Sequence, residues 1–202
     1  YDINKCPYLR EAYECRKWAF VSDYARFDVL YQYGGIYFDT DVEVLKKFPS
    51  SLFDYQAFTG VESTNIVAPG LVFACESGGT VLREILDDYE KSHFLEAGNQ
   101  NLMTVNERVT SILQKKGFHA NGQFQVIEGL AVFPSEYFCG YNLDLQEFEI
   151  TENTITIHHY ASSWASGRDL AHRNARKLLR RIIGKKRYMT VQALVRRLKN
   201  KK

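Results

Sequence analysis

The stretch GGIYFDTDVEVL, residues 34–45, decides the fold. Two adjacent glycines interrupt a helical pattern, and the apolar residues after them predict a short buried strand at 36–39. Three carboxylates then fall at alternate positions, Asp39, Asp41 and Glu43. Carboxylates this close repel one another and raise one another's pKa, which a divalent cation would relieve. The sequence therefore predicts a buried strand whose carboxyl end carries a cation site, although alternate acids in isolation more often form a solvated face.

The residues on either side of this stretch predict a layered α/β fold. Apolar residues at three- and four-residue intervals predict helices at 7–33, 80–91 and 102–116, and strands are expected at 42–45, 56–59, 71–74, 124–127, 131–133 and 154–159. Strands that alternate with helices indicate an α/β architecture. Because open α/β sheets bind ligands at the carboxyl ends of their strands, the acidic stretch lies where a ligand is expected.

Size and composition indicate one main domain with a buried hydrophobic core. The chain has 202 residues, and its 45% hydrophobic content is sufficient to bury a core. No run of about eighteen uncharged apolar residues occurs, so no segment is expected to cross a bilayer by itself. The four cysteines are scattered without a metal-ligand spacing, and we expect reduced thiols that serve in packing.

Charge divides the chain near Gly167. Residues 168–202 carry a net charge of +13 and residues 1–167 a net charge of −11. We therefore expect a main domain at 1–167 and a basic helical extension at 168–202, with helices at 169–183 and 190–199. The extension can be a solvated face, a basic amphipathic surface for an anionic membrane, or a cap on the acidic body. Its basic residues alternate with aliphatic rather than stacking aromatic ones, so nucleic acid is not an expected partner.

A second informative stretch is TITIHHYASSW, residues 154–164. An alternating strand ends in His158 and His159, and Ser163 and Trp164 follow. Oxygen ligands with one imidazole suit Mn²⁺ or Mg²⁺. Only one of the two histidines can face the acidic site from a strand, and the residue pattern alone leaves the choice open.

Two other kinds of protein also use clustered acids. Phosphatases with an aspartate nucleophile carry D-x-[TV], but here the second residue after Asp41 is Glu43, and the acidic pair Asp87 and Asp88 falls in a predicted helix. A non-catalytic, metal-dependent sugar-binding module would need neither the motif S-D-x-x-R upstream nor H-H-Y-A-S-S-W downstream. Both alternatives remain open but less favoured.

The longer stretch WAFVSDYARFDVLYQYGGIYFDTDVEVL, residues 18–45, resembles the sugar-binding region of the DXD glycosyltransferases of family 32. That family groups bacterial capsular polysaccharide and lipopolysaccharide enzymes with yeast-type initiating mannosyltransferases, and it is related to the clostridial glucosylating toxins. The shared motifs are S-D-x-x-R followed by G-G-x-Y-x-D-x-D, and the resemblance extends to about residue 165. It implies a GT-A-like, Rossmann-type nucleotide-sugar transferase fold, here without the N-terminal strand region that carries much of the base-binding pocket.

The resemblance assigns roles around the donor sugar. Asp23 and Arg26, which share a helical face, would hold the sugar's hydroxyls. Tyr37 would pack under the nucleotide or sugar, and Gly35 would allow the backbone to approach the substrate closely. Asp39 would reach the ribose, the sugar or a metal-bound water.

The resemblance also assigns the metal and the leaving group. Asp41 would ligate the metal directly with support from Asp39, and His159 is the favoured third ligand because it lies five residues before Trp164, as in related motifs. Ser163 and Trp164 would donate hydrogen bonds to the diphosphate. Asp39, Asp41, Arg26 and Trp164 would thus form the catalytic set.

These roles predict a metal-dependent, retaining hexosyltransferase (EC 2.4 class). It would move a hexose or N-acetylhexosamine from a nucleotide-diphosphate sugar to a saccharide or lipid-linked saccharide acceptor in surface polysaccharide synthesis. No carboxylate is an obvious covalent nucleophile, so a same-face mechanism is expected, in which the leaving phosphate helps to deprotonate the acceptor. The expected location is cytoplasmic, with peripheral attachment to the inner membrane face through the basic extension.

Overall fold

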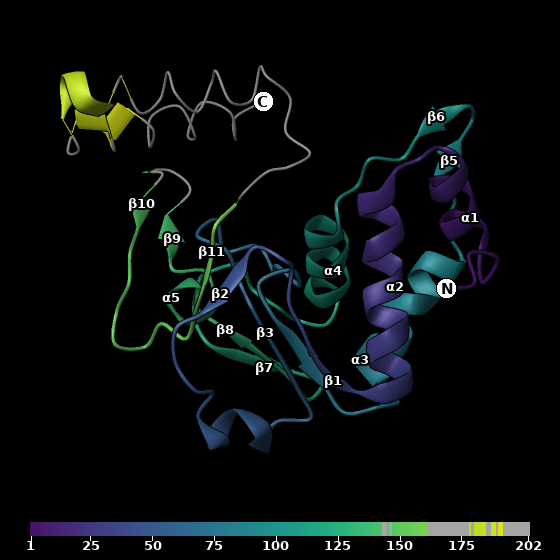
Figure 1. Ribbon diagram of the computed structural model, residues 1–202, viewed down its shortest axis with the longest axis horizontal. Coiled ribbons are helices and arrows are strands. Elements are labelled where there is room, and N and C mark those ends of the chain that lie inside the picture. The colour runs from purple at the N-terminus through teal and green to yellow at the C-terminus, as the bar shows by residue number, and fades with distance from the viewer. Residues whose placement is uncertain are drawn as a thin grey trace.

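A five-stranded sheet forms the centre of the molecule (Figure 1). The computed structural model describes residues 1–142, 145, 147–160, 178, 180–184, 187, 188, 190 and 191. In spatial order the strands of the sheet are β1 (Gly35–Tyr37), β4 (Phe73–Cys75), β3 (Ala57–Gly60), β8 (Leu130–Phe133) and β7 (Gln125–Ile127). Strands β3 and β8 run parallel, and the other neighbouring pairs in this sheet are antiparallel. This α/β architecture, with a mixed sheet that contains a parallel pair, is compatible with a GT-A-like fold.

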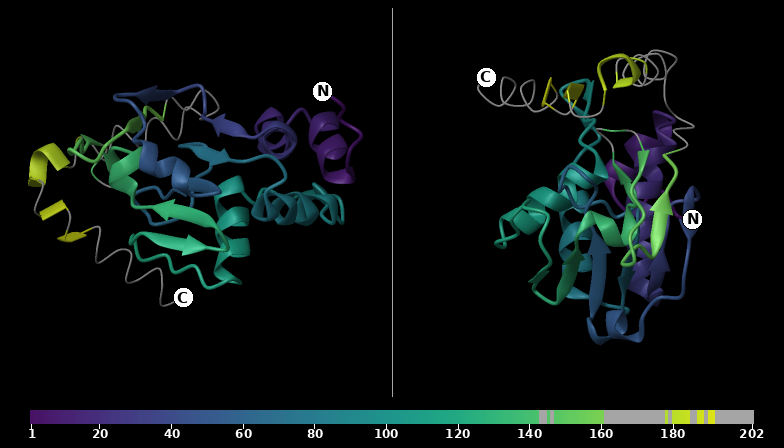
Figure 2. Two further views of the ribbon diagram at one scale, coloured as in Figure 1. Left: turned by 90° about the horizontal axis from the view of Figure 1, so that it is seen from below. Right: turned by 90° about the vertical axis from the view of Figure 1, so that its left-hand side faces the viewer.

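Four helices lie on one side of the sheet, and the first of them packs on the other helices rather than on the strands of the sheet (Figures 1 and 2). They are α1 (Pro7–Glu14), α2 (Trp18–Tyr33), α3 (Thr80–Glu90) and α4 (Val105–Gln114). Strand residues alternate between the two faces, as the pleat requires: Phe73 packs with the helices, whereas its neighbour Ala74 packs on the opposite side. Helix α4 begins with a capping box, in which Thr104 and Glu107 bond each other's backbone N–H.

Shorter elements cover the other face. The segment η1 (Ser50–Asp54) and helix α5 (Ser135–Phe138) lie there, next to a two-stranded antiparallel ribbon of β2 (Val42–Val44) and β11 (Thr156–His158). Two further hairpins complete the description: β5 (Leu95–Glu96) with β6 (Asn99–Gln100), and β9 (Tyr141–Asn142) with β10 (Glu147–Phe148). The ribbon holds the segment after Asp39 against the segment that ends in the two histidines.

Two sequence expectations are wrong in detail. The helix expected at 7–33 is divided in two, because Arg16 has a φ of 55° that no helix continues. Strand β1 was expected to be buried, but it is the edge of the sheet, and Ile36 is 38% exposed. By contrast, α2 ends where the sequence predicts: Gly34 has a φ of 66°, and a Cβ there would lie 2.9 Å from the Ser77 nitrogen.

The described residues bear on other expectations to different extents. All four cysteines are free thiols, and Cys6 and Cys139 are buried. Among the described residues, no helix combines the length and apolar character needed to cross a bilayer. The boundary expected near Gly167 and most of the two basic helices lie outside the described residues.

Candidate functional site

The acidic stretch begins where β1 ends. The carboxyl ends of β3 and β8 lie at the same end of the sheet, because β1, β3 and β8 run in the same direction. The Asp39 N–H donates to the carbonyl of Gly70 at 2.9 Å, which fixes the chain as it leaves the sheet. A Cβ at position 70 would overlap the Asp39 carboxylate, so any side chain there would displace that carboxylate from its present position. The Val42 N–H then donates to the Asp39 carbonyl at 3.1 Å, closing a turn that presents both aspartates.

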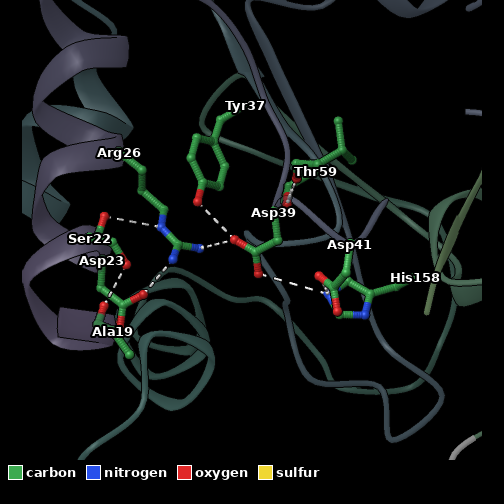
Figure 3. A network of polar contacts seen from close by, with 10 residues as sticks. Ala19, Ser22, Asp23, Arg26, Tyr37, Asp39, Asp41, Thr59 and His158 are labelled. Atoms are coloured by element: carbon green, nitrogen blue, oxygen red, sulfur yellow. Dashed lines mark hydrogen bonds and ion pairs between the residues drawn. The ribbon is translucent and has the colours of Figure 1, made fainter. Parts of the chain in front are cut away.

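Asp39, Asp41 and His158 meet at this turn (Figure 3). His158 Nε2 lies 3.2 Å from Asp41 Oδ1 and 3.8 Å from Asp39 Oδ2. The ring is held from behind, because its Nδ1 accepts a hydrogen bond of 3.0 Å from the Tyr160 N–H. Two carboxylates and one imidazole therefore face a common point.

The choice of His159 as third member of this group is corrected by the structure. His158 lies opposite Val42 in the β2–β11 ladder and faces the aspartates, whereas His159 Nε2 pairs with Glu43 Oε2 at 2.8 Å. The two histidines follow each other on an extended segment, so their side chains point to opposite sides. Glu43, which had no assigned role, is thus turned away from the site together with His159.

The residue types at this point fit a hard divalent ion. One ligand atom from each of Asp39, Asp41 and His158 lies within 4.8 Å of the other two. Their side chains are 33%, 25% and 11% exposed, so an ion held here would keep an open side for water or for the oxygens of a diphosphate. This set is the expected donor chemistry for Mn²⁺ or Mg²⁺, with His158 in the place predicted for His159.

Asp23 and Arg26 form a buried ion pair beside the turn. They are three residues apart on α2, and Arg26 Nη2 lies 2.7 Å from Asp23 Oδ1. Both residues are 7% exposed, so this ion pair is buried and does not lie on the surface. Burial raises the pKa of the Asp23 carboxyl to about 6, although the Arg26 charge opposes that shift.

Arg26 connects the helix to the acidic turn through Asp39. Its Nη1 lies 3.3 Å from Asp39 Oδ1, yet this buried nitrogen makes no hydrogen bond to any described residue. The guanidinium also lies over the ring of Tyr37, 4.6 Å from its centroid, and the Tyr37 hydroxyl donates to Asp39 Oδ1 at 2.8 Å. Figure 3 shows the resulting chain of contacts from Asp23 through Arg26 and Asp39 to His158.

The state of Asp39 follows from these contacts. Burial alone would raise the pKa of its carboxyl, but the neighbouring His158 ring, the charge of Arg26 and the hydrogen bond from the Tyr37 hydroxyl together lower that pKa below the ordinary value. Asp39 is therefore held as a carboxylate, the form that can bind a cation.

Other predicted site residues are placed differently. Gly35 lies at the far end of β1 from Asp39, and its φ of 111° gives it a conformational reason to be glycine. Its substrate contact stays a prediction. Ser163 and Trp164 lie outside the described residues, and their roles also stay predictions. Sequence reasoning missed Gly70; the Pro69–Gly70 turn was its only signal.

The acidic pair considered for a phosphatase is used elsewhere. Asp87 and Asp88 lie within α3, where Asp87 pairs with Arg83 at 2.7 Å and Asp88 pairs with Arg108. Neither belongs to the cluster of Asp39, Asp41 and His158. The fold and the site together describe an α/β protein with a candidate cation site next to a buried acid–arginine pair.

Residues 2–59 match the family model described as "Glycosyltransferase sugar-binding region containing DXD motif". The matched span includes Asp23, Arg26, Asp39 and Asp41 but ends long before His158. Searches of curated proteins and of solved structures each return no match. The family match supports a DXD glycosyltransferase family and a glycosyltransferase-type function, with a nucleotide-sugar donor and a divalent cation as the partners typical of such domains.

Proposed function

We propose that this protein is a metal-dependent, retaining glycosyltransferase of the family 32 type. It would transfer a hexose or N-acetylhexosamine from a nucleotide-diphosphate sugar to a saccharide or lipid-linked saccharide acceptor in surface polysaccharide synthesis. The observation that carries the proposal is the double use of Asp39, which lies 3.3 Å from Arg26 and 3.8 Å from His158. One carboxylate thus joins a polar pair suited to a sugar to a group suited to a cation.

The α2 side of the site would hold the donor sugar. The Nη1 group of Arg26 is buried and lacks a hydrogen bond within the described part of the chain, so a sugar hydroxyl would satisfy it. Asp23 would accept a hydrogen bond from a sugar hydroxyl, and its ion pair with Arg26 at 2.7 Å would hold the carboxylate in place. Contacts of this kind hold a reacting sugar in one orientation, which lowers the barrier to transfer.

The turn side would hold the diphosphate. A bound divalent ion would neutralise the charge that develops on the leaving phosphate as the sugar–phosphate bond breaks. Asp39, Asp41 and His158 would hold that ion, and Tyr37 keeps Asp39 oriented through its hydrogen bond of 2.8 Å. Ser163 and Trp164 would add hydrogen bonds to the diphosphate. The acceptor would attack from the face that the leaving phosphate occupies, giving retention.

Calorimetry with UDP and GDP, each with and without Mn²⁺, tests the proposal. A glycosyltransferase site predicts nucleoside diphosphate affinity that depends on the cation, because the residues that would hold the ion are carboxylates that would otherwise repel the phosphates. A sugar-binding module predicts no such affinity, and a phosphatase predicts hydrolysis of p-nitrophenyl phosphate instead. Release of free sugar from a panel of nucleotide sugars would then identify the donor.

We further propose that the enzyme works at the inner, cytoplasmic membrane face, where a lipid-linked acceptor would be found. The basic extension is held to the body in part: Arg180 pairs with Glu147 at 2.9 Å, and Tyr188 is 1% exposed. Leu178 and Ile182 remain 59% and 72% exposed. Each basic residue near an anionic leaflet contributes about 1 kcal/mol.

Sedimentation with anionic and neutral vesicles at low and high salt tests this location. Binding to anionic vesicles that weakens with salt is expected. Equal binding to both lipids, or none, would leave the extension as a cap on the acidic body.

A further inference from the structure

A third acidic residue, Glu62, lies at the same sheet edge as Asp39. Strand β3 ends at Gly60, and the Val61 N–H still donates to the Phe133 carbonyl at the end of β8, at 3.0 Å. Glu62 then opens a tight turn, since its carbonyl accepts from the Asn65 N–H at 2.8 Å. Strands β1 and β3 are both antiparallel to β4 and therefore run in the same direction. Their carboxyl ends bring both acids to one edge.

The Glu62 carboxylate is partly buried and only half satisfied. Its Oε1 accepts a hydrogen bond of 2.7 Å from the Thr64 hydroxyl. Its other oxygen has no hydrogen bond, and no lysine or arginine pairs with it, within the part of the chain that the structure describes. The acids of the α2 side differ in this respect, because Asp23 pairs with Arg26 and Asp28 with Lys5. The other oxygen of Glu62 is not one of the buried atoms left without a hydrogen bond, so it is accessible and can accept a hydrogen bond from a ligand.

The surroundings of Glu62 place it on the His158 side of the site. Burial chiefly raises the pKa of Glu62, and the charge of nearby His158 opposes the rise. After burial, the charge of Glu62 also contributes to the raised pKa values of Tyr160 and Cys139. The hydroxyl and the thiol of these two residues lie 3.3 Å apart. The Tyr160 ring lies 4.2 Å from the His158 ring, centroid to centroid. In Figure 1 strand β11, which ends in His158, lies on the far side of β1 from α2.

We propose that Glu62 binds a hydroxyl group of the acceptor saccharide. The proposal rests on the proposed function, in which Asp23 and Arg26 hold the donor sugar on the α2 side. A carboxylate on the opposite side of the cation site then faces the second substrate. A hydrogen bond from a neutral hydroxyl to a carboxylate is short and about twice as strong as one between neutral groups.

Two variants of Glu62 and one control variant test whether its carboxylate binds the saccharide. Glu62→Ala removes both carboxylate oxygens, whereas Glu62→Gln keeps the shape and one acceptor oxygen. Glu76→Gln is the matched control, because Glu76 is exposed and follows β4 at the opposite edge of the sheet. Thermal unfolding of each variant shows that the fold is retained.

The experiment measures ligand binding by the full chain with Mg²⁺ and the nucleoside diphosphate that binds best. Saturation-transfer NMR reports the binding of methyl α- and β-glycosides of glucose, galactose, mannose, N-acetylglucosamine and N-acetylgalactosamine. We expect at least one glycoside to bind, with affinity reduced about tenfold or more in Glu62→Ala and about threefold in Glu62→Gln. The control should bind as the parent does, and nucleoside diphosphate affinity should be equal in all four proteins.

Glycoside binding by Glu62→Ala that equals the parent's would overturn the inference alone. A loss of nucleoside diphosphate affinity in Glu62→Ala would also overturn it, by placing Glu62 among the cation ligands. A parent that binds the nucleoside diphosphate but no glycoside overturns it too, because every member of the panel offers the hydroxyls that the proposal requires. A parent without metal-dependent nucleoside diphosphate affinity overturns the proposed function itself.

Discussion

Two buried arginines in this protein look alike in isolation. Arg26 on α2 and Arg108 on α4 are 7% and 3% exposed, each lies over a tyrosine ring, and each has one nitrogen without a hydrogen bond among the described residues. They differ in what surrounds them. Arg108 lies over two rings, Tyr8 at 5.1 Å and Tyr89 at 4.2 Å, and bonds Ser92 at 3.0 Å. It is enclosed by the helices.

Arg26, by contrast, faces the acidic turn. Its nitrogen without a hydrogen bond is Nη1, which lies 3.3 Å from Asp39 Oδ1 at the acidic turn, whereas that of Arg108 is Nε, in a side chain that is only 3% exposed. Burial and ring stacking therefore do not separate a binding arginine from a structural one. The position of the unsatisfied donor relative to a strand end does.

The largest expected effect comes from removing Asp41, a proposed cation ligand at the turn that Arg26 faces. Asp41→Ala should reduce Mn²⁺-dependent nucleoside diphosphate affinity more than about 100-fold, because changing even an outer-shell partner of a metal ligand costs about 10- to 100-fold. Stability should change little, since the repulsion between Asp39 and Asp41 is relieved. Calorimetry measures the affinity. A variant that binds as tightly as the parent would show that Asp41 is not a ligand.

The structural arginine should respond in stability. Arg108→Ala should lower the free energy of unfolding by about 3 kcal/mol, because it empties the space between Tyr8 and Tyr89 and removes two cation–π contacts. Urea unfolding measures this change. Nucleoside diphosphate affinity, measured below the unfolding transition, should remain that of the parent. A selective loss of affinity would place Arg108 in the site.

The binding arginine should respond in turnover. Arg26→Ala should lower the rate of donor-sugar release about 100-fold, since the sugar loses an orienting contact. Its stability loss should be smaller than that of Arg108→Ala, because Asp23 can take up a proton when its partner is removed. Steady-state kinetics and urea unfolding are the paired measurements. Equal stability losses in the two variants would erase the distinction between the two arginines.

Asp23 should make the free energy of unfolding depend on pH. Its pKa is about 6 in the folded chain and 3.8 in the unfolded chain, so the folded state binds the proton more tightly. The stabilisation this provides is present below pH 4 and is lost as pH rises to 6, a fall of about 2 kcal/mol. Asp23→Asn should remove that part of the slope. Urea unfolding from pH 4 to 7 measures the difference, and a parent that gains stability relative to Asp23→Asn over this range would contradict it.

The smallest expected effect separates the neighbouring histidines. His158→Ala should weaken Mn²⁺-dependent nucleoside diphosphate binding at least about tenfold, because losing a proposed direct ligand should cost no less than losing an outer-shell partner. His159→Ala should leave it unchanged, because that ring pairs with Glu43 on the other side of the ribbon. The reverse order of the two variants in calorimetry would restore the choice made from sequence.

The sequence was most informative where chemistry and local spacing coincide. Asp23 and Arg26 share a face because three residues make nearly one helical turn, and the acids follow the strand that the glycine pair introduces. It could not choose between His158 and His159, because alternation along a strand does not reveal its register with a partner distant in sequence. The edge position of β1 and the role of Gly70 depend in the same way on which segments become neighbours. Glu62 was missed because a single acid after an apolar run is common.

The pairing of β2 with β11 has a consequence for the length of the chain. His158 lies opposite Val42, and its N–H is bonded to the Cys139 carbonyl at 3.1 Å, so the register of β11 is held from two sides. A shift of the register by one residue would turn the His158 ring outward and bring a neighbouring residue opposite Val42. Loss of one residue between β10 and β11 would place His159 there, whereas gain of one residue would place Ile157 there. The adjacent histidines should therefore keep an imidazole beside the two aspartates after a one-residue deletion but not after a one-residue insertion.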